Sequence, residues 1–286
     1  YIYKGMRANH HTNSSNTPGG RGKNNPREIG VVAKQSLGQN FLMHQATANR
    51  IAKSADLFAL STVLEIGPGT GMLTKSLLAE AGHVVAVEAD AELIPRLTET
   101  FQTEIASGKL TLVQGDVRTF DLSTLPRDYV AVANIPYYIT GELLRFLLSG
   151  PYKPNHITFL VQKEVAVRIT RSKKESLLSL SVKVFGTPKY RFTVPRGAFR
   201  PAPKVDSAVL YIGNITQPFS SPAEEERFFA VLHAGFAHKR KLLIKNLEAI
   251  ATAGEITQAF SECGLNPKVR AEDVPVAVWK KLSSLL

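Results

Sequence analysis

The chain has 286 residues, 44% of them hydrophobic and 21% charged, which is enough for one large globular domain and a small one. No apolar run approaches the roughly 20 residues of a membrane-spanning helix, and a single cysteine, Cys263, excludes an internal disulfide and a cysteine-based metal cluster. A formal net charge of +11 and a pI near 9.7 favour a polyanionic partner such as nucleic acid, with an acidic protein as the alternative. Low cysteine use fits a reducing compartment, so we expect a cytoplasmic protein.

The start of the chain differs in composition from the rest. The stretch HHTNSSNTPGGRGKNNPREIG (His10–Gly30) is polar, rich in Gly, Pro and Asn and without periodicity, which predicts a disordered basic extension over residues 1–34. It has one acid, Glu28, and neither an amphipathic helical pattern nor the apolar core of a secretory signal. A basic tail that contacts RNA and an expression-vector remnant both remain open, as does the natural start, because Met6 follows Tyr1.

From Gln35 onward, short apolar runs rich in Val and Ile alternate with longer stretches of helical pattern. The predicted helices include Met72–Ala81 and Ala91–Ile105. The alternation predicts an α/β fold, with a parallel sheet and helices on both faces. The material between Phe185 and Ser207 is expected to be loop. The predicted strands are Val63–Ile66, Val84–Val87, Leu110–Val113, Tyr129–Ala133, Ile157–Val161, Leu177–Phe185 and Ser207–Ile212.

A composition break follows the last predicted strand. The stretch GNITQPFSSPAEEE (Gly213–Glu226) has turn residues and then a helix start at Ser221 or Pro222. Beyond it, Phe228–Leu286 has the pattern of several helices and no clear strand. We therefore predict an α/β domain over residues 35–213 and a small all-helical C-terminal domain over residues 221–286. The histidines have no metal-ligand spacing, so no metal site is expected.

A glycine-rich turn joins the first predicted strand to the first helix. It is VLEIGPGTGMLT (Val63–Thr74), with glycines at 67, 69 and 71. Glycines let a ligand approach the backbone closely, and in open α/β sheets ligands lie at the carboxyl ends of the strands. Taken alone, the turn could also be no more than a tight strand-to-helix connection.

Acidic residues at the strand ends indicate which ligand the turn would bind. Glu88 could accept hydrogen bonds from both ribose hydroxyls, and Asp116, after the next strand, from an adenine amino group. Either acid alone could be a helix cap. The G-x-G-x-G spacing fails the dinucleotide template, and no Gly-Lys-Ser/Thr follows for a P-loop. Glu65 would repel a pyrophosphate but attract a sulfonium and an ammonium group, which favours S-adenosylmethionine.

Four motifs, in this order, resemble those of the ribosomal RNA adenine N6-dimethyltransferases, and most closely the bacterial small-subunit (16S) rRNA branch. The resemblance extends from about Gln35 to the C-terminus. It implies a Rossmann-like class I methyltransferase sheet, S-adenosylmethionine as cofactor, and N6,N6-dimethylation of adenines in small-subunit rRNA during ribosome biogenesis. It also implies a monomer that binds an immature ribosomal subunit through its helical C-terminal domain. The motifs are GQNFL (Gly38–Leu42), EIGPGTGMLT (Glu65–Thr74), NIPY (Asn134–Tyr137) and FRPAPKVDSAV (Phe199–Val209).

The resemblance also assigns roles to cofactor-binding residues. Asn40 and Leu42 would contact the cofactor at the N-terminal edge, and Gly67, with Gly69 in the same turn, would lie under its methionine portion. The remaining roles are Glu88 for the ribose, Asp116 for the adenine and Asn134 for the junction of cofactor and target base. Ile135 stands where the family usually has Leu, a small change if this position contributes only backbone.

The NIPY motif suits the chemistry of a poor nucleophile, the exocyclic nitrogen of adenine. Its lone pair is delocalised into the ring, so hydrogen bonds accepted by Asn134 and by the carbonyl of Ile135 or Pro136 would turn that lone pair toward the methyl group. Tyr137 would stack on the base, with Phe199 on its other face. The alternative is a buried turn whose tyrosines belong to the core.

Two basic stretches are candidates for rRNA contact, because cations bind phosphates in a salt-dependent way. In the first, Lys183–Lys204, cations alternate with aromatic residues and no acid occurs. The second, AHKRKLLIKNL (Ala237–Leu247), predicts an amphipathic helix with a basic face, although an ordinary solvated face is the alternative. The predicted RNA-binding residues are Arg196, Arg200, Lys204, Lys239, Arg240 and Lys241.

Other functions remain open on these observations. One is a large-subunit rRNA adenine methyltransferase of the macrolide-resistance type; another is a non-catalytic nucleic-acid-binding relative. A third is a DNA adenine methyltransferase, which would use an Asn-x-Pro-Tyr motif in the same way. The FRPAPKVDS stretch and the helical tail favour the small-subunit enzyme by resemblance, and an intact set of Glu88, Asp116 and Asn134 favours catalysis.

Overall fold

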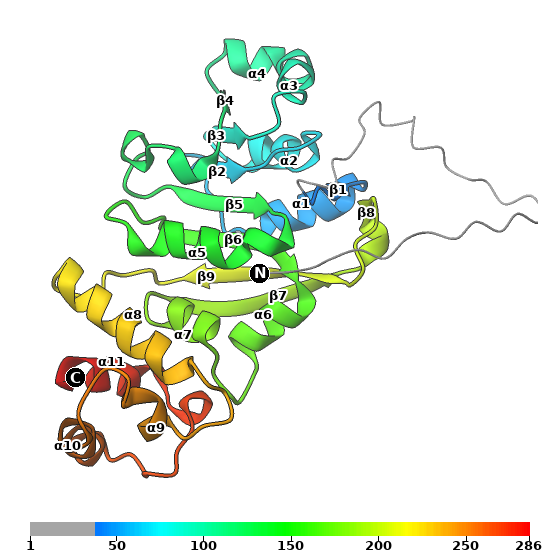
Figure 1. The fold of residues 1–286 in the computed structure, drawn as a ribbon. Coiled ribbons are helices and arrows are strands. Elements are labelled where there is room, and N and C mark those ends of the chain that lie inside the picture. The colour runs from blue at the N-terminus through cyan, green and yellow to red at the C-terminus, as the bar shows by residue number, and fades with distance from the viewer. Residues whose placement is uncertain (1–37) are drawn as a thin grey trace, which may run out of the picture. The chain divides into compact units, whose positions relative to one another are not determined.

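The computed structural model describes residues 38–286, and the extension predicted over residues 1–34 lies outside the described residues (Figure 1). A seven-stranded sheet has the order β4-β3-β2-β5-β6-β9-β7, and a separate two-stranded sheet pairs β1 (Phe41–Leu42) with β8 (Phe199–Arg200). The strands of the large sheet are β2 (Thr62–Ile66), β3 (His83–Glu88), β4 (Leu110–Gln114), β5 (Val130–Asn134), β6 (His156–Gln162), β7 (Thr187–Val194) and β9 (Ser207–Gly213).

The large sheet is mixed rather than wholly parallel. Strands β4, β3, β2, β5 and β6 run parallel, whereas β9 is antiparallel to both β6 and β7. The five parallel strands and β9 lie where the sequence predicts them. The parallel part is buried in its strands β2, β3, β5 and β6, which are mainly apolar, whereas its edge strand β4 is partly exposed. Its carboxyl ends meet at one edge, where the candidate site lies.

One predicted strand is wrong and one strand was missed. Leu177–Phe185 forms helix α7 (Leu177–Lys183) instead. Its apolar residues alternate as in a strand, but Ser176 and Ser179 make a capping box that begins a helix. The missed strand is β7, in the segment expected to be loop. It is an edge strand with Pro188 near its start, and its side chains are mostly half-exposed.

The predicted helices at Met72–Ala81 and at Ser221 are confirmed. Ala91–Ile105 is divided, because the helix breaks at Phe101. Within residues 222–286 the structure has helices and no strand. The helix bounds are α1 (Gln45–Lys53), α2 (Met72–Glu80), α3 (Ile94–Thr100), α4 (Gln102–Ala106), α5 (Thr140–Ser149), α6 (Lys163–Thr170), α8 (Pro222–Phe236), α9 (Leu243–Leu247), α10 (Ala253–Cys263) and α11 (Val276–Leu285). None of the helices in residues 38–286 has the length and apolarity needed to span a membrane.

The amphipathic helix predicted over Ala237–Leu247 is wrong for most of its length. Residues 238–242 form a turn, and only α9 at its end is helical. The buried side-chain amide of Asn246 donates hydrogen bonds to the carbonyl oxygens of Gly235 (2.6 Å) and His238 (3.2 Å). These bonds satisfy carbonyls at the end of α8 and fix the reversal of the chain. We call residues 238–242 the basic turn.

The hydrophobic core runs without a break from the sheet into the C-terminal helices. Figure 1 shows α8–α11, yellow to red, beyond the β9–β7 side of the sheet. Rings at the junction pack closely, with centroids 5.7 Å apart for Phe185 and Phe219 and 5.2 Å apart for Phe219 and Phe228. Trp279 of α11 is fully buried in the same cluster. A domain boundary near residues 213–221 stays a prediction.

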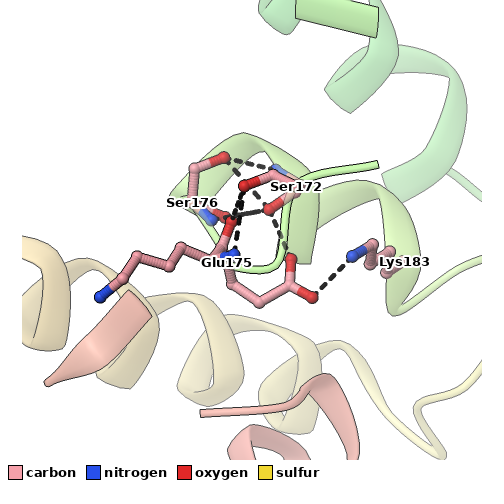
Figure 2. A network of polar contacts seen from close by, with 6 residues as sticks. Ser172, Glu175, Ser176 and Lys183 are labelled. Atoms are coloured by element: carbon pink, nitrogen blue, oxygen red, sulfur yellow. Dashed lines mark hydrogen bonds and ion pairs between the residues drawn. The ribbon is translucent and has the colours of Figure 1, made fainter. Parts of the chain in front are cut away.

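A polar network joins residues of the turn between α6 and α7 to one another and to Lys183 of α7 (Figure 2). The carboxylate of Glu175 accepts hydrogen bonds from Ser179 Oγ (2.7 Å) and Lys183 Nζ (2.6 Å). The backbone N–H of Glu175 donates to the carbonyl oxygen of Glu272 (2.7 Å), in the segment before α11. The Glu175–Lys183 pair is mostly buried, so its position is well defined.

Candidate active site

A cavity of about 260 Å³ lies at the carboxyl ends of β2, β3, β4 and β5. Loops after these strands and the segment before α1 form its walls. Residues lining it to which the sequence analysis gave no role include Gln39, Thr70, Val117, Arg118 and Tyr138. The sequence-predicted residues that line it are Asn40, Leu42, Gly67, Gly69, Glu88, Asp116, Asn134, Pro136 and Tyr137.

The glycine turn has a backbone that only glycine adopts without strain. Gly67, Gly69 and Gly71 have φ of +68°, +61° and +82°, in the left-handed region. A Cβ on Gly71 would lie 2.5 Å from the ring of Phe101 and force the packing apart. At Gly67, by contrast, a Cβ would meet nothing within 4 Å, so this part of the turn faces open space.

Glu88, at the end of β3, is fixed by backbone donors on both sides. Its side chain is 5% exposed, and its two oxygens accept from the N–H groups of Gly69 and Asp90, each at 2.9 Å. Burial raises the pKa of Glu88, and these hydrogen bonds oppose the rise. Each oxygen keeps acceptor capacity for a ligand hydroxyl. The acid thereby links the glycine turn to the neighbouring strand.

Asp116, after β4, is held by its neighbour Arg118. The carboxylate caps a short 3-10 turn (Val117–Thr119) by accepting from the backbone N–H of Arg118 at 2.9 Å. The guanidinium of Arg118 donates to both carboxylate oxygens and, through Nη1, to Glu142 Oε1 at 3.0 Å. The hydrogen bonds from Arg118 lower the pKa of Asp116, which is therefore ionised at neutral pH.

Asn134, at the end of β5, brings two distant motifs together. Its Nδ2 donates to the carbonyl oxygen of Asn40 at 3.0 Å, which joins the NIPY segment to the GQNFL segment. Asn40 in turn donates to the carbonyl oxygen of Gly38 at 3.0 Å. With its amide nitrogen engaged, Asn134 keeps its Oδ1 as an acceptor at the cavity wall.

The two tyrosines of the NIPYY segment have different environments. Tyr137 is half-buried, and its hydroxyl is hydrogen-bonded to Ser207 Oγ at 2.6 Å. Burial raises the pKa of Tyr137. Tyr138 is 69% exposed, lines the cavity mouth and lies against Gly38, where a Cβ would be 3.1 Å from its ring. Neither ring is buried in the core, as a purely structural turn would require.

Two predicted site residues are not among those that line the cavity. Glu65 lies in β2, 1% exposed, and neither of its oxygens has a hydrogen-bond partner among the described residues. Desolvation, opposed by the hydroxyl of Thr74 and reinforced by the charge of Glu88, raises the pKa of Glu65 to about 8. Phe199 is 4% exposed and pairs, in β8, with Leu42 of β1.

The predicted RNA-binding residues lie in two places. Arg196 and Lys204 are exposed on the β7–β9 connection, where Arg200 is half-buried. Lys239, Arg240 and Lys241 are exposed in the basic turn, and within residues 38–286 they form no ion pair. Their exposure leaves them available to a polyanion.

The sheet, the glycine turn and the acidic strand ends around one cavity define a Rossmann-like class I methyltransferase. Two crystal structures share this fold. One, described as the 23S rRNA methyltransferase ErmE, is 27% identical with a TM-score of 0.68, covering 86% of this chain and 99% of that one. The other, a dimethyladenosine transferase from Plasmodium falciparum, is 24% identical with a TM-score of 0.72, covering 85% and 95%.

The family follows from sequence comparison. A profile described as ribosomal RNA adenine dimethylase matches residues 31–286, and the chain belongs to this family, as the motifs predict. Proteins named ribosomal RNA small subunit methyltransferase A are among its relatives. One from Dehalococcoides mccartyi is 38% identical over 262 residues, 88% of each chain; one from Lactococcus lactis is 36% identical over 266 residues, 88% of this chain and 90% of the relative.

Two cavity residues received no role from the sequence, although the sequence holds a signal for each. Tyr138 directly follows the NIPY motif, and a second exposed aromatic beside a base-binding motif is a recognisable signal. Arg118 follows Asp116 by two residues, the spacing at which a capping turn returns the side chain to the acid. Its second partner, Glu142, is distant in sequence, so that contact had no local signal.

Proposed function

We propose that this protein transfers methyl groups from S-adenosylmethionine to N6 of adenines in small-subunit (16S) rRNA, giving N6,N6-dimethyladenosine during ribosome biogenesis. One observation carries the proposal: the amide of Asn134 is held at the cavity wall with its oxygen left as an acceptor. The relatives named small subunit methyltransferase A support this choice of rRNA.

The residues present fit S-adenosylmethionine. The space above Gly67 accommodates a chain laid along the backbone, and Glu88 offers two oxygens to ribose hydroxyls. Asp116 offers an acceptor to the adenine amino group. The buried Glu65 lacks a partner among the described residues, so its ionised form would be stabilised by a nearby cation. When bound, the cofactor supplies a methyl group activated by a sulfonium.

The chain's own residues would prepare the target nitrogen. Asn134 Oδ1 and a carbonyl of Ile135 or Pro136 accept hydrogen bonds from the amino hydrogens and turn the lone pair toward the methyl donor. Tyr137 stacks on the base and holds it in line. No strong base is needed first, because the nitrogen's proton becomes acidic once the new N–C bond forms. Phe199 would support this wall through its pairing with Leu42.

The exposed cations would bind the rRNA. Arg196, Arg200 and Lys204 flank the FRPAPKVDS segment, and Lys239, Arg240 and Lys241 form the basic turn. Two separate basic patches suit a shaped RNA surface such as an immature small subunit. A monomer working in the cytoplasm, where subunits are assembled, is consistent with this reaction.

A second candidate is methylation of large-subunit rRNA. The 27% identity with the structure described as a 23S rRNA methyltransferase favours it. The residues of the cavity do not distinguish the two reactions, because both would methylate N6 of an adenine. The two candidates therefore differ only in which rRNA binds the basic surface.

The deciding experiment offers labelled S-adenosylmethionine and the protein separately to immature small subunits and to protein-free large-subunit rRNA, then identifies the labelled nucleosides. We expect N6,N6-dimethyladenosine from the small subunit alone. Label only in large-subunit rRNA would assign the second candidate. No label in either, with RNA still bound, would leave a nucleic-acid-binding relative without catalysis.

A further inference from the structure

Arg118 is partly exposed at the cavity, yet several hydrogen bonds hold its side chain in one position. Its side chain is 46% exposed, yet Nε lies 2.9 Å and 3.0 Å from the two oxygens of Asp116, Nη2 donates to Asp116 Oδ2, and Nη1 donates to Glu142 Oε1 at 3.0 Å. Exposed ion pairs add little to folding stability. The arrangement therefore calls for an explanation at the cavity that Arg118 lines.

The contacts limit what Asp116 can accept. An ionised carboxylate has about four lone-pair positions. Three donors of Arg118 occupy this carboxylate, namely the backbone N–H, Nε and Nη2, and Nε is shared between both oxygens, so at most one position remains for a ligand donor. Because Arg118 also keeps Asp116 ionised, the carboxylate has no proton with which to donate.

Arg118 itself offers little to a ligand acceptor. Three of its five N–H groups are engaged, on Nε and Nη2 with Asp116 and on Nη1 with Glu142. The second N–H of Nη1 and that of Nη2 point away from Asp116, because the guanidinium is planar. A purine with a carbonyl at C6 would meet the charged acceptor Asp116, with the remaining N–H groups of Arg118 directed away from that carboxylate, whereas a purine with an amino group could donate to its remaining lone pair. A fork of two N–H groups also fixes the carboxylate plane more firmly than a single cation would.

Glu142 connects this subsite to the reaction site. It lies in the first turn of α5, directly after the short 3-10 turn Tyr137–Ile139 that carries the NIPYY tyrosines. Through Arg118, Glu142 ties the loop after β4 to the loop after β5. The position of the adenine subsite and that of the NIPY segment are thereby set together.

We propose that Arg118 is a positioning residue that orients Asp116 so that the cofactor subsite selects an adenine amino group over a 6-oxo purine. This inference deepens the proposed function and rests on it, since the subsite is the one assigned to the adenine of S-adenosylmethionine. Glu142 holds Arg118 in the selective orientation.

The test measures binding of S-adenosylhomocysteine and of S-inosylhomocysteine, its 6-oxo analogue, by calorimetry. The wild-type chain should prefer the adenine compound roughly 100-fold. Arg118→Ala should lower that ratio about tenfold, chiefly by weakening the adenine compound. Arg118→Lys should restore it only in part, because one ammonium cannot form the fork, and Glu142→Gln should have a smaller effect than Arg118→Ala.

The matched control is Arg168→Ala, which removes the same charge from an exposed pair with Glu164 on α6, among residues that do not line the cavity. It should leave the ratio unchanged. Equal weakening of both compounds in Arg118→Ala would mean a merely structural role and would overturn the inference alone. If the wild-type chain bound neither compound, the cofactor assignment itself would fall, and the inference with it. Thermal unfolding of each variant confirms that it is folded.

Discussion

The cavity walls and the basic turn differ in how their side chains are held. In the cavity, Glu88 is nearly buried and accepts two backbone hydrogen bonds, and Asn134 is fixed to the carbonyl of Asn40. In the basic turn, Lys239 and Arg240 are exposed, and within residues 38–286 they form no ion pair. Fixed groups suit one small ligand of defined shape, whereas free cations suit a large polyanion whose phosphates can be met in several ways.

This difference predicts that substitutions in the two regions should change different measured quantities. A change in the cavity should act on cofactor affinity or on the rate of transfer and leave RNA binding almost unchanged. A change in the basic turn should act on RNA affinity and its salt dependence, and leave the cofactor site intact.

The largest effect is expected from Asn134→Ala. It removes the acceptor proposed for the amino group and should lower methyl transfer about 100- to 1,000-fold, the usual cost of one oriented hydrogen bond in a transition state. RNA affinity should stay within about twofold. Transfer of label and filter binding of the same rRNA measure the two quantities. If methyl transfer and RNA binding were lost together, Asn134 would not act on catalysis alone, and the proposed distinction between the two regions would fail.

Glu88→Gln should come next. The amide would direct an N–H group at a backbone N–H and would offer one acceptor instead of two, so affinity for S-adenosylhomocysteine should fall about 10- to 100-fold. Calorimetry measures the affinity. Glu99→Gln makes the same charge change on the exposed part of α3 and should have no effect. An equal loss in both variants would point to net charge rather than to the fixed carboxylate.

A triple variant, Lys239→Ala with Arg240→Ala and Lys241→Ala, tests the other region. Removing three phosphate-binding cations should weaken rRNA binding about tenfold near physiological salt and flatten its dependence on salt. Cofactor affinity should not change. Removing Lys53, Lys75 and Lys109, which are exposed elsewhere, provides a control of equal charge. If the control variant weakened RNA binding as much as the triple variant, the effect would come from net charge, and the basic turn would not be a specific RNA-binding site.

Glu65→Gln should give the smallest effect, and one that depends on pH. The folded chain holds a proton on Glu65 up to about pH 8, against 4.5 for an ordinary glutamate, so folding takes up a proton between these values. Stability of the wild type therefore falls as the pH rises through this window, and the neutral glutamine avoids that loss. The free energy of unfolding of the variant, relative to wild type, should be higher at pH 8.5 than at pH 5 by at least about 1 kcal/mol.

Denaturant unfolding of the cofactor-free protein at the two pH values measures this gain. Taking the difference in unfolding free energy between variant and wild type removes the contribution of the other titrating groups. A gain that is the same at both pH values would show that Glu65 is ionised throughout, and that its burial in β2 is compensated in another way.

Much of the cavity could be predicted from sequence, because its geometry is local. The glycine turn needs left-handed backbone at Gly67, Gly69 and Gly71, and the acids stand directly at strand ends. Such positions follow from the order of strands alone. The parallel strands themselves are apolar runs, which is why their positions are confirmed.

The remainder depends on contacts between distant segments. The period-two alternation of Leu178, Leu180 and Val182 predicted a strand, and only the capping box at Ser176 reveals the helix. The turn at 238–242 depends on Asn246 reaching back to α8. The burial of Glu65 in β2, outside the residues that line the cavity, follows from the packing of the sheet, which no local pattern encodes.

The pairing of β1 with β8 determines when the wall of the cavity is completed during synthesis of the chain. Phe41 and Leu42 are paired with Arg200 and Phe199, and the adjoining Asn40 forms part of the cavity wall. A nascent chain has made the glycine turn and both acids long before residue 200 emerges from the ribosome. Its N-terminal wall would then be held by the hydrogen bond from Asn134 to Asn40, without the strand partner of β1. This wall would therefore be completed only once residue 200 has emerged, through a contact of long sequence separation.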